Sequence, residues 1–281
     1  MKRPRTLKVS HSSSFQSSKW HEAEEMKADS EPRFSVIVPT YNEEKLLPKL
    51  LSSLKWQSWR DFEVIVADDG SSDRTRSIAE NSGAKLVVND RIGEYPSRNA
   101  AARIATGSLL VFTGADAIMP SKFLAKIESA FRNDSKLVGL YGPTFPYDAP
   151  IWAKLEFTIW YTINTMLYLI TREANASTAF FAVKRDIFLR AGGFANLAHA
   201  DSSMSRQLSK RFRVRPTLRL LIFVSGRRTK TGLSDFNRHH LVMVADAFFR
   251  FLRNSDWVRR ERSYRMGIHS RSGGRTERSG T

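Results

Sequence analysis

The chain has 281 residues, of which 41% are hydrophobic and 26% are charged, so it can build the core of a soluble globular protein. It has no cysteine, which excludes disulfides, cysteine nucleophiles and thiolate metal sites and fits a reducing compartment. The net charge of +17 is concentrated in residues 203–281, whose 19 basic and five acidic residues favour a phosphate-bearing partner: nucleic acid, a lipid headgroup or a lipid-linked substrate.

Residues 1–32 are rich in serine and in charge and show little apolar periodicity, so we expect a disordered tail. The basic start of the chain is followed by a polar stretch instead of the apolar segment that a signal peptide needs. We therefore expect no secretion signal and a cytoplasmic protein.

The hydrophobic pattern from residue 34 onward alternates short apolar runs with amphipathic segments. The expected strands are 34–38, 64–67, 84–88, 109–112 and 137–141, and the expected helices are 46–56, 73–81, 119–131 and one within 93–107. Ser72 or Asp73 is expected to cap the second of these helices, with Gly83 just past its end. This alternation predicts a mostly parallel sheet that is covered on both faces.

An unusual aromatic stretch occupies residues 151–170. Its charge-free part, residues 157–170, is too short to span a bilayer unassisted, so we expect an interfacial or buried helix. Farther along, the pattern predicts a strand at 177–183, a short helix, a helix at 202–211, a strand pair within 214–224, an amphipathic helix at 235–253 and a disordered basic tail at 263–281.

Two carboxylates, Asp68 and Asp69, follow the expected strand at 64–67 directly. In an open α/β sheet, ligands bind outside the carboxyl ends of the strands, so these acids are well situated to contact a ligand. Acids at such a position can equally hold the backbone amides of a capped turn. The local pattern leaves both interpretations open.

Three strand-end segments, residues 39–43, 68–73 and 114–116, together resemble the motifs of family 2 glycosyltransferases of the GT-A fold. Residues 96–101 and 192–194 are also similar to that family. The resemblance covers residues 33–225 and implies an α/β domain with a Rossmann-like, mostly parallel central sheet flanked by helices. Its donor half would be residues 33–143 and its acceptor half residues 144–225, followed by a basic amphipathic helical extension at 226–262.

The resemblance also implies that a nucleotide-diphosphate sugar binds at the strand ends. A carboxylate that accepts a hydrogen bond from a ring N–H suits uracil, so Asp69 favours a UDP-sugar. The residues that the resemblance assigns to nucleotide-sugar binding are Pro39, Thr40, Tyr41, Glu43, Asp68, Asp69 and Arg98.

A diphosphate leaving group needs a hard cation, and Mg²⁺ or Mn²⁺ takes carboxylate and phosphate oxygens. The resemblance makes Asp116 the metal ligand; the alternative is that Asp116 caps the helix expected from residue 119. Gly114 stands where the family often has a first acid, which leaves part of the metal or ribose contact to water or to Asp68.

Asp201 matches the family's general base, which takes the acceptor's proton during a direct displacement with inversion. Its usual acidic neighbour is replaced by Ala200, and Asp201 could also cap the 202–211 helix. The family's Gln-x-x-Arg-Trp signature is absent from residues 207–212, which favours addition of a single sugar over polymer synthesis.

The expected acceptor is a glycan or polyprenyl-phosphate-linked molecule that offers a hydroxyl or phosphate. Apolar faces at 151–170 and 235–253, with the arginines between them, suit peripheral association with the anionic cytoplasmic face of a membrane. Alternatively, both helices pack on the domain or form a dimer.

Two other functions compete with this reading. A nucleotidyltransferase normally has a glycine-rich phosphate loop after its first strand, and residues 39–46 contain no glycine. A degenerate, catalytically weak transferase fold could serve as a scaffold that binds membrane or nucleic acid through the basic C-terminal part. Nucleic acid is the less favoured partner because the sequence contains no RNA-binding motif.

Overall fold

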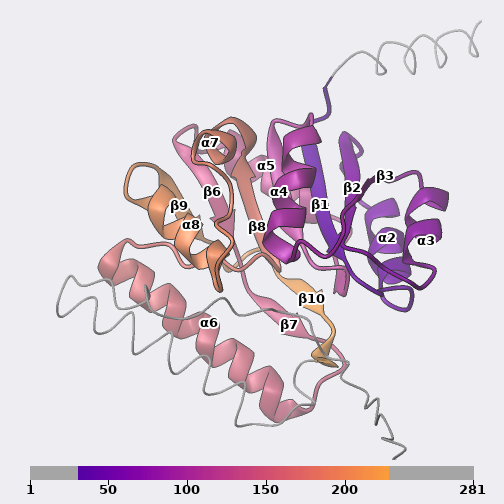
Figure 1. The fold of residues 1–281 in the computed structure, drawn as a ribbon. Helices are drawn as coiled ribbons and strands as arrows, with labels where there is room; N and C mark the ends of the chain where they lie inside the picture. The colour runs from indigo at the N-terminus through magenta and orange to yellow at the C-terminus, as the bar shows by residue number, and fades with distance from the viewer. Residues whose placement is uncertain (1–30, 228–281) are drawn as a thin grey trace, which may run out of the picture.

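The computed structural model describes residues 31–227. The expected helix at 235–253, most of the expected extension at 226–262, the tail at 263–281 and residues 1–30 lie outside the described residues. Within the described part, a large sheet carries helices on both faces, and a smaller sheet lies beside it (Figure 1).

The large sheet has seven strands in the order β3-β2-β1-β4-β8-β6-β9. Only β8 runs antiparallel to its neighbours, so the prediction of a mostly parallel sheet is confirmed. The strands are β1 (Phe34–Thr40), β2 (Phe62–Asp68), β3 (Lys85–Val88), β4 (Leu109–Thr113), β6 (Leu137–Tyr141), β8 (Phe180–Lys184) and β9 (Arg213–Pro216).

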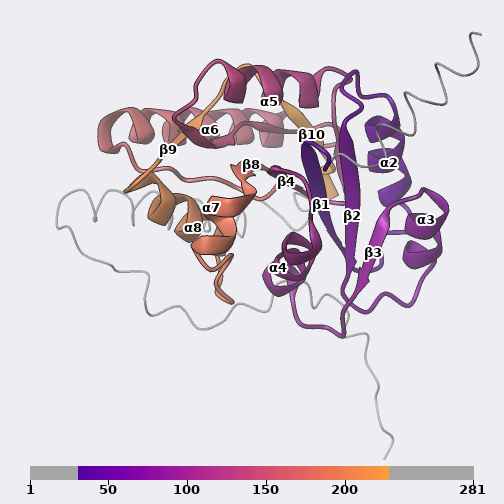
Figure 2. The ribbon, with the colours of Figure 1, turned by 90° about the horizontal axis from the view of Figure 1, so that it is seen from above.

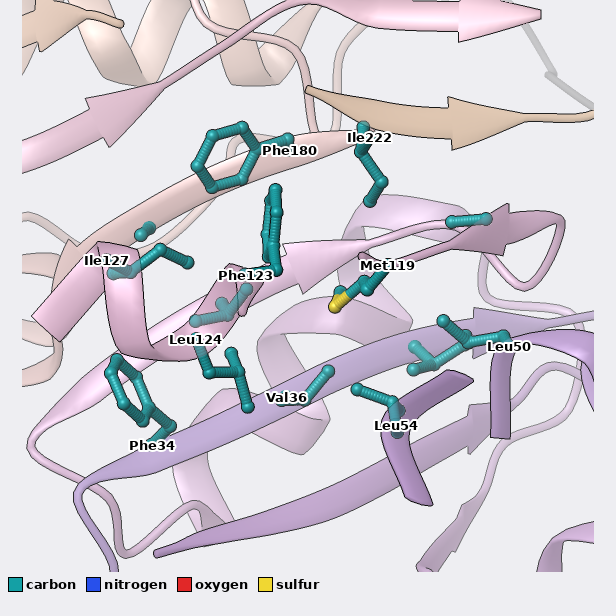
Figure 3. Packing of buried hydrophobic residues seen from close by; sticks show 14 of the residues in the cluster. Phe34, Val36, Leu50, Leu54, Met119, Phe123, Leu124, Ile127, Phe180 and Ile222 are labelled. Carbon is teal, nitrogen blue, oxygen red and sulfur yellow. The ribbon is translucent and has the colours of Figure 1, made fainter. Parts of the chain in front are cut away.

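Helices pack against both faces of this sheet and enclose two separate cores (Figure 2). One face carries α2 (Leu47–Lys55), α3 (Thr75–Asn81) and α5 (Phe123–Arg132), and the other carries α4 (Glu94–Ile104), α7 (Arg185–Arg190) and α8 (Ala200–Ser209). Successive side chains of a strand point to opposite faces of the sheet, so β4 contributes side chains to both cores. Val111 belongs to the core on the first face, which also contains Phe123 and Phe180. Figure 3 shows these two phenylalanines packed together. On the second face, the Phe112 ring lies 4.8 Å from that of Phe194.

Strand register brings the predicted site segments to one edge of the sheet. Thr40 pairs with Asp68 across β1 and β2, and Ile37 pairs with Phe112 across β1 and β4. The antiparallel strand β8 begins at the same edge, because Phe180 lies opposite Thr113. Residues that follow β1, β2 and β4 therefore meet residues that precede β8.

The smaller sheet returns the chain to that edge. It has the order β5-β10-β7 and consists of β5 (Ala117–Ile118), β10 (Ile222–Val224) and β7 (Thr144–Pro146). Val224 pairs with Ala117, and the Ser225 amide then donates a hydrogen bond to the Asp116 carbonyl at 3.1 Å. The last described residues consequently lie next to Asp116.

The aromatic stretch forms one helix, α6 (Ile151–Thr171), which contacts β7 and β9. Only Ala153 of this helix is buried, so the interpretation of residues 151–170 as a buried helix is wrong. Among residues 31–227, no helix combines the length and the apolarity needed to cross a membrane. The exposed large apolar residues of α6 are Ile151, Leu155, Ile159, Met166, Leu169 and Ile170.

Two expectations from the sequence are wrong. The helix expected from residue 119 begins at Phe123, because residues 117–118 pair with β10 and the buried Gln57 side chain accepts the Leu124 amide at 3.0 Å. The two strands within 214–224 form, but they do not pair with each other: β9 joins the large sheet and β10 the small one. Hydrophobic alternation predicts strands without naming their partners.

Candidate active site

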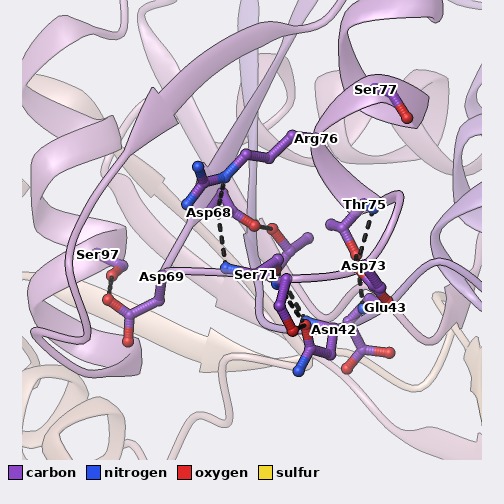
Figure 4. A network of polar contacts seen from close by, with 12 residues as sticks. Asn42, Glu43, Asp68, Asp69, Ser71, Asp73, Thr75, Arg76, Ser77 and Ser97 are labelled. Carbon is purple, nitrogen blue, oxygen red and sulfur yellow. Dashed lines mark hydrogen bonds and ion pairs between the residues drawn. The ribbon is translucent and has the colours of Figure 1, made fainter.

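Asp68 holds the turn after β2 (Figure 4). Its carboxylate is fully buried, lies 2.6 Å from Nε of Arg76 and accepts the Ser71 amide at 3.1 Å. Burial by itself raises the pKa of Asp68, but the hydrogen bonds from Ser71 and the ion pair with Arg76 outweigh it and lower the pKa. For Asp68 the geometry is therefore that of a turn-holding acid, and its contact with a ribose stays a prediction.

Asp69 joins the end of β2 to the start of α4. One carboxylate oxygen accepts the Ile92 amide at 2.8 Å and the Ser97 hydroxyl at 3.2 Å, and the other accepts the Gly93 amide at 2.9 Å. Gly93 has φ of +101°, a conformation that favours glycine. The side chain is only partly buried, and a carboxylate has about four acceptor positions, so one remains for a ligand donor.

The end of β1 contributes an aromatic surface. Arg91, which follows β3, donates a hydrogen bond from Nη2 to the Tyr41 hydroxyl at 2.7 Å, and its guanidinium lies 5.1 Å from the centre of the Tyr41 ring. Thr40 is buried beside Asp68, and Pro39 precedes it in the strand. Arg91 is not among the residues predicted from the sequence, although its place after an expected parallel strand indicates this edge.

Arg98 lies inside the protein and not on the site surface. Its side chain is 2% exposed, and it donates to the Thr113 carbonyl at 2.9 Å and to the Glu94 carboxylate at 2.8 Å. The bond to Thr113 ties α4 to the end of β4, and the bond to Glu94 lies within α4. In this arrangement Arg98 positions the strand end, and a direct contact with a nucleotide stays a prediction.

Asp116 follows β4 with 14% of its side chain exposed. It does not cap α5, which begins seven residues later, so the capping alternative is wrong. An added Cβ at Gly114 would lie 2.6 Å from an Asp116 carboxylate oxygen, so glycine at position 114 leaves room for that carboxylate.

The acids at this edge fit a cation shared with a ligand and not a cation held by protein alone. Within the described chain, no group of three or more His, Asp or Glu side chains is arranged to hold a metal ion. Mg²⁺ in nucleotide sites is typically bound by one or two carboxylates plus substrate phosphates. Asp116 meets that requirement if a diphosphate supplies the remaining oxygens.

Arg227 lies against this acid. Its guanidinium donates two hydrogen bonds to the Glu43 carboxylate, at 2.5 and 2.7 Å, and its Nε is 3.5 Å from Asp116. The hydrogen bonds to Glu43 outweigh burial and raise the pKa of Arg227. The motif after β1 indicates Glu43 as a donor-site residue, but Arg227 stands among the arginines of the acceptor side, and no local pattern links the two positions.

Asp201 lies in the first turn of α8 and is 8% exposed. Its carboxylate accepts the Thr178 amide at 2.9 Å, the Thr178 hydroxyl at 3.3 Å and the Ser202 amide at 2.8 Å. Tyr95 of α4 is buried near it, and burial together with the Asp201 charge raises the pKa of Tyr95. The N-cap of α8 is His199, so the alternative in which Asp201 caps this helix is wrong.

Two motifs that lie far apart in the sequence meet beside Asp201. The Asn99 side chain donates to the Phe194 carbonyl at 2.7 Å and accepts the Phe194 amide at 2.9 Å. Gly193 has φ of +73°, and an added Cβ there would lie 2.6 Å from the Asn99 oxygen. The α4 helix therefore contacts both halves of the site, through Ser97 and Asp69 on one side and through Tyr95 and Asp201 on the other.

Comparison with known proteins identifies relatives of this chain. A family model described as "Glycosyl transferase family 2" matches residues 35–191, more than half of the chain. A PGL/p-HBAD biosynthesis glycosyltransferase of Mycobacterium bovis is 40% identical over 91 residues, which are 30% of this chain and 36% of that protein. The chain thus spans about a third of the length of the curated relatives that it matches.

Solved structures share the fold. A mannosyltransferase, PcManGT from Pyrobaculum calidifontis, in complex with GDP-Man and Mn²⁺, has a TM-score of 0.64 and 23% identity, covering 86% of this chain and 72% of that one. TarS 1–349 of S. aureus in complex with UDP-GlcNAc has a TM-score of 0.53 and 22% identity, covering 69% and 59%.

Proposed function

Because the chain belongs to glycosyl transferase family 2, we propose that it moves a single sugar from a nucleotide-diphosphate sugar to an acceptor, with inversion at the anomeric carbon. Its fold is the GT-A fold that the sequence resemblance implied. One observation carries the proposal: Asp69, Asp116 and Asp201 come from different parts of the chain and lie at the same edge of the sheet.

The donor's nucleotide would lie at the ends of β1 and β2, against Tyr41 and Asp69. The remaining acceptor position of Asp69 suits the N–H of uracil, so a UDP-sugar is the favoured donor. Related folds are known in complex with GDP-Man and with UDP-GlcNAc, so both nucleotides belong in the test. Pro39, Thr40 and Glu43 complete the β1 side of this site.

The diphosphate would lie beside Asp116. A bound Mg²⁺ or Mn²⁺ would neutralise charge that develops on the leaving diphosphate. Asp116 would hold the cation, and Gly114 would keep the space that its carboxylate needs. Asp68 is committed to Arg76 and Ser71, so we assign it to support of the turn and not to the cation.

Asp201 would accept the proton of the acceptor hydroxyl. A carboxylate held by Thr178 and Ser202 keeps a fixed direction, which a general base needs in order to meet the attacking oxygen. An acceptor that is already an ionised phosphate would not need this proton transfer. Loss of activity on removal of the Asp201 charge therefore distinguishes a hydroxyl acceptor from a phosphate acceptor.

We propose an anionic membrane surface as the place of reaction, with a polyprenyl-phosphate-linked or glycan acceptor. The exposed side of α6 carries six large apolar residues, and the threonines there bond to their own helix: the Thr158 and Thr162 hydroxyls donate to carbonyls four residues earlier. The net charge of +17 complements anionic lipid.

A thermal-shift screen of the purified chain with UDP-, GDP- and dTDP-sugars, each with and without Mn²⁺, tests the proposal. Ligands that bind only the folded state raise its apparent stability. We expect a metal-dependent shift with one nucleotide class, and slow metal-dependent hydrolysis of the same sugar nucleotide that Asp116→Ala abolishes. A chain that binds donors but never turns them over would instead be the catalytically weak scaffold.

A further inference from the structure

Three charged side chains from distant parts of the chain form one cluster at the donor edge: Glu43 after β1, Asp116 after β4, and Arg227 after β10. Glu43 and Arg227 are separated by 184 positions in the sequence. The guanidinium lies between the two carboxylates, bidentate to Glu43 and with its Nε 3.5 Å from Asp116. The Arg227 side chain therefore connects Glu43, which we assign to nucleotide binding, with Asp116, which we assign to the metal.

The backbone holds Arg227 in this place by several contacts. The Ser225 amide bonds to the Asp116 carbonyl, and the Ser225 hydroxyl and the Gly226 amide bond to the Asp148 carboxylate. An added Cβ at Gly226 would lie 2.6 Å from Cβ of Ala149, so the chain passes where a larger residue would not fit. Pairing of β10 with β5 and β7 fixes the approach, so the position of Arg227 follows from the fold.

The charges in the cluster oppose metal binding to the donor-free protein. The guanidinium would repel a divalent cation on the Asp116 carboxylate, because both carry positive charge within a few ångströms of the same oxygens. A nucleoside diphosphate reverses this balance, since its phosphates attract both cations. The guanidinium is accessible to such an anion, because 40% of the Arg227 side chain is exposed.

We propose that Arg227 is a diphosphate-binding residue that pairs with Glu43 and Asp116 before the donor enters and with the donor's phosphates afterwards. This assignment rests on the proposed function of the Asp116 edge and deepens it. Arginine's planar fork matches phosphate oxygens as well as it matches the carboxylate that it now holds. Metal binding and nucleotide binding would then be coupled: each would strengthen the other by the same factor.

The test measures Mn²⁺ affinity by electron paramagnetic resonance of free Mn²⁺, on the 281-residue chain, with and without UDP or GDP. Arg227→Gln removes the charge and keeps a polar side chain of similar reach. Arg227→Lys keeps the charge and loses the fork. Arg190→Gln is the matched control, because Arg190 pairs with Asp186 on the exposed surface of α7.

We expect Arg227→Gln to tighten Mn²⁺ binding to the nucleotide-free chain by roughly fivefold or more, and to weaken diphosphate binding in the presence of Mn²⁺ by a similar factor. Arg227→Lys should bind Mn²⁺ alone almost as weakly as the wild type, and Arg190→Gln should match the wild type in both measurements.

An unchanged Mn²⁺ affinity in Arg227→Gln, with wild-type coupling to the nucleotide, overturns the assignment of Arg227 and leaves the proposed function standing. A wild-type chain that binds neither Mn²⁺ nor UDP nor GDP in any combination overturns the proposed function and this inference with it.

Discussion

Asn99 and Phe194 exchange two hydrogen bonds across the second core: the Asn99 amide nitrogen donates to the Phe194 carbonyl at 2.7 Å, and its oxygen accepts the Phe194 amide at 2.9 Å. The Phe194 ring also packs on Phe112 and Phe188, with centroid distances of 4.8 and 4.9 Å. One side chain of α4 thereby fixes the loop that leads into α8 and Asp201.

Replacing Asn99 with alanine should lower the free energy of unfolding by about 1–3 kcal/mol, because two backbone groups of Phe194 lose their partners. Urea denaturation of the purified protein measures this change. Asn133→Ala is the control, since the Asn133 side chain makes an exposed contact of 3.4 Å with Ser129 and the substitution keeps its backbone bond. Equal stability of the two variants would contradict the role of Asn99.

Adjacent glycines should respond differently to alanine. Gly192 and Gly193 both have positive φ, so either substitution costs about 1–2 kcal/mol in backbone strain. Only at Gly193 does the new Cβ meet another group, the Asn99 oxygen at 2.6 Å, whereas nothing lies within 4 Å at Gly192. Gly193→Ala should therefore be the less stable variant in urea denaturation.

A double-mutant cycle isolates that contact. If the Cβ at position 193 collides with Asn99, then Gly193→Ala should cost less in an Asn99→Ala background than in the wild type, whereas Gly192→Ala should cost the same in both. Additive effects for both glycines would show that the 193 position is restricted by its backbone alone.

Stability should fall in acid through Glu63. Burial opposes ionisation of Glu63, but Lys85, Ser35 and Thr106 outweigh it and lower the pKa to about 2. A lowered folded-state pKa adds stability that is complete above the unfolded-state pKa, near 4.5, and is lost as pH falls toward about 2. The expected loss is on the order of 2–3 kcal/mol.

Urea denaturation between pH 6 and pH 2 measures this dependence. Glu63→Gln should flatten the curve in that range and start from a lower stability at pH 6. Asp186→Asn is the control, because the Asp186–Arg190 pair is exposed on α7 and surface pairs contribute little. An acid-stability curve for Glu63→Gln that parallels the wild type would rule out Glu63 as its source.

Membrane binding should depend on the exposed face of α6. Leu155 and Ile159 are 57% and 55% exposed, so Leu155→Asp with Ile159→Asp should leave the fold intact and abolish flotation with anionic vesicles. Ile104→Asp, on α4, is the control. Absence of flotation for the wild type would refute the membrane proposal, and a dimer that the double variant dissociates would show that the face binds a second copy of the chain.

Local patterns in the sequence predicted the strands and helices well, because the apolar runs and helical periodicity are set by which side chains face the two cores. The run 64–67 lies within β2, and Gly83 follows α3 with φ of +76°, as a helix C-terminus favours. The cap of α3 differs from the expectation: its N-cap is Arg74, which makes no side-chain cap bond, and Asp73, one residue earlier, accepts the Thr75 amide at 2.9 Å.

Long-range relationships were not predictable in the same way. Nothing in the pattern at 214–224 shows that β10 pairs with β5, so the approach of Arg227 to Glu43 could not be foreseen. Arg98 shows the opposite case: its place in a family-like motif suggested a ligand contact, whereas its guanidinium is buried against the Thr113 carbonyl, which lies on β4. Only its pairing with Glu94, four residues earlier in α4, is local in the sequence.

The central claim is that two carboxylates divide the work, Asp116 on the diphosphate and Asp201 on the acceptor's proton. Side-by-side measurement of Mn²⁺-dependent donor binding and sugar transfer in Asp116→Asn, Asp201→Asn and the control Asp186→Asn, an exposed acid on α7, tests it most directly. We expect Asp116→Asn to lose metal-dependent binding, and Asp201→Asn to keep it while transfer to a hydroxyl acceptor falls by about 10²- to 10⁴-fold. Wild-type transfer by either variant, or metal-dependent donor binding retained in Asp116→Asn, would contradict the claim.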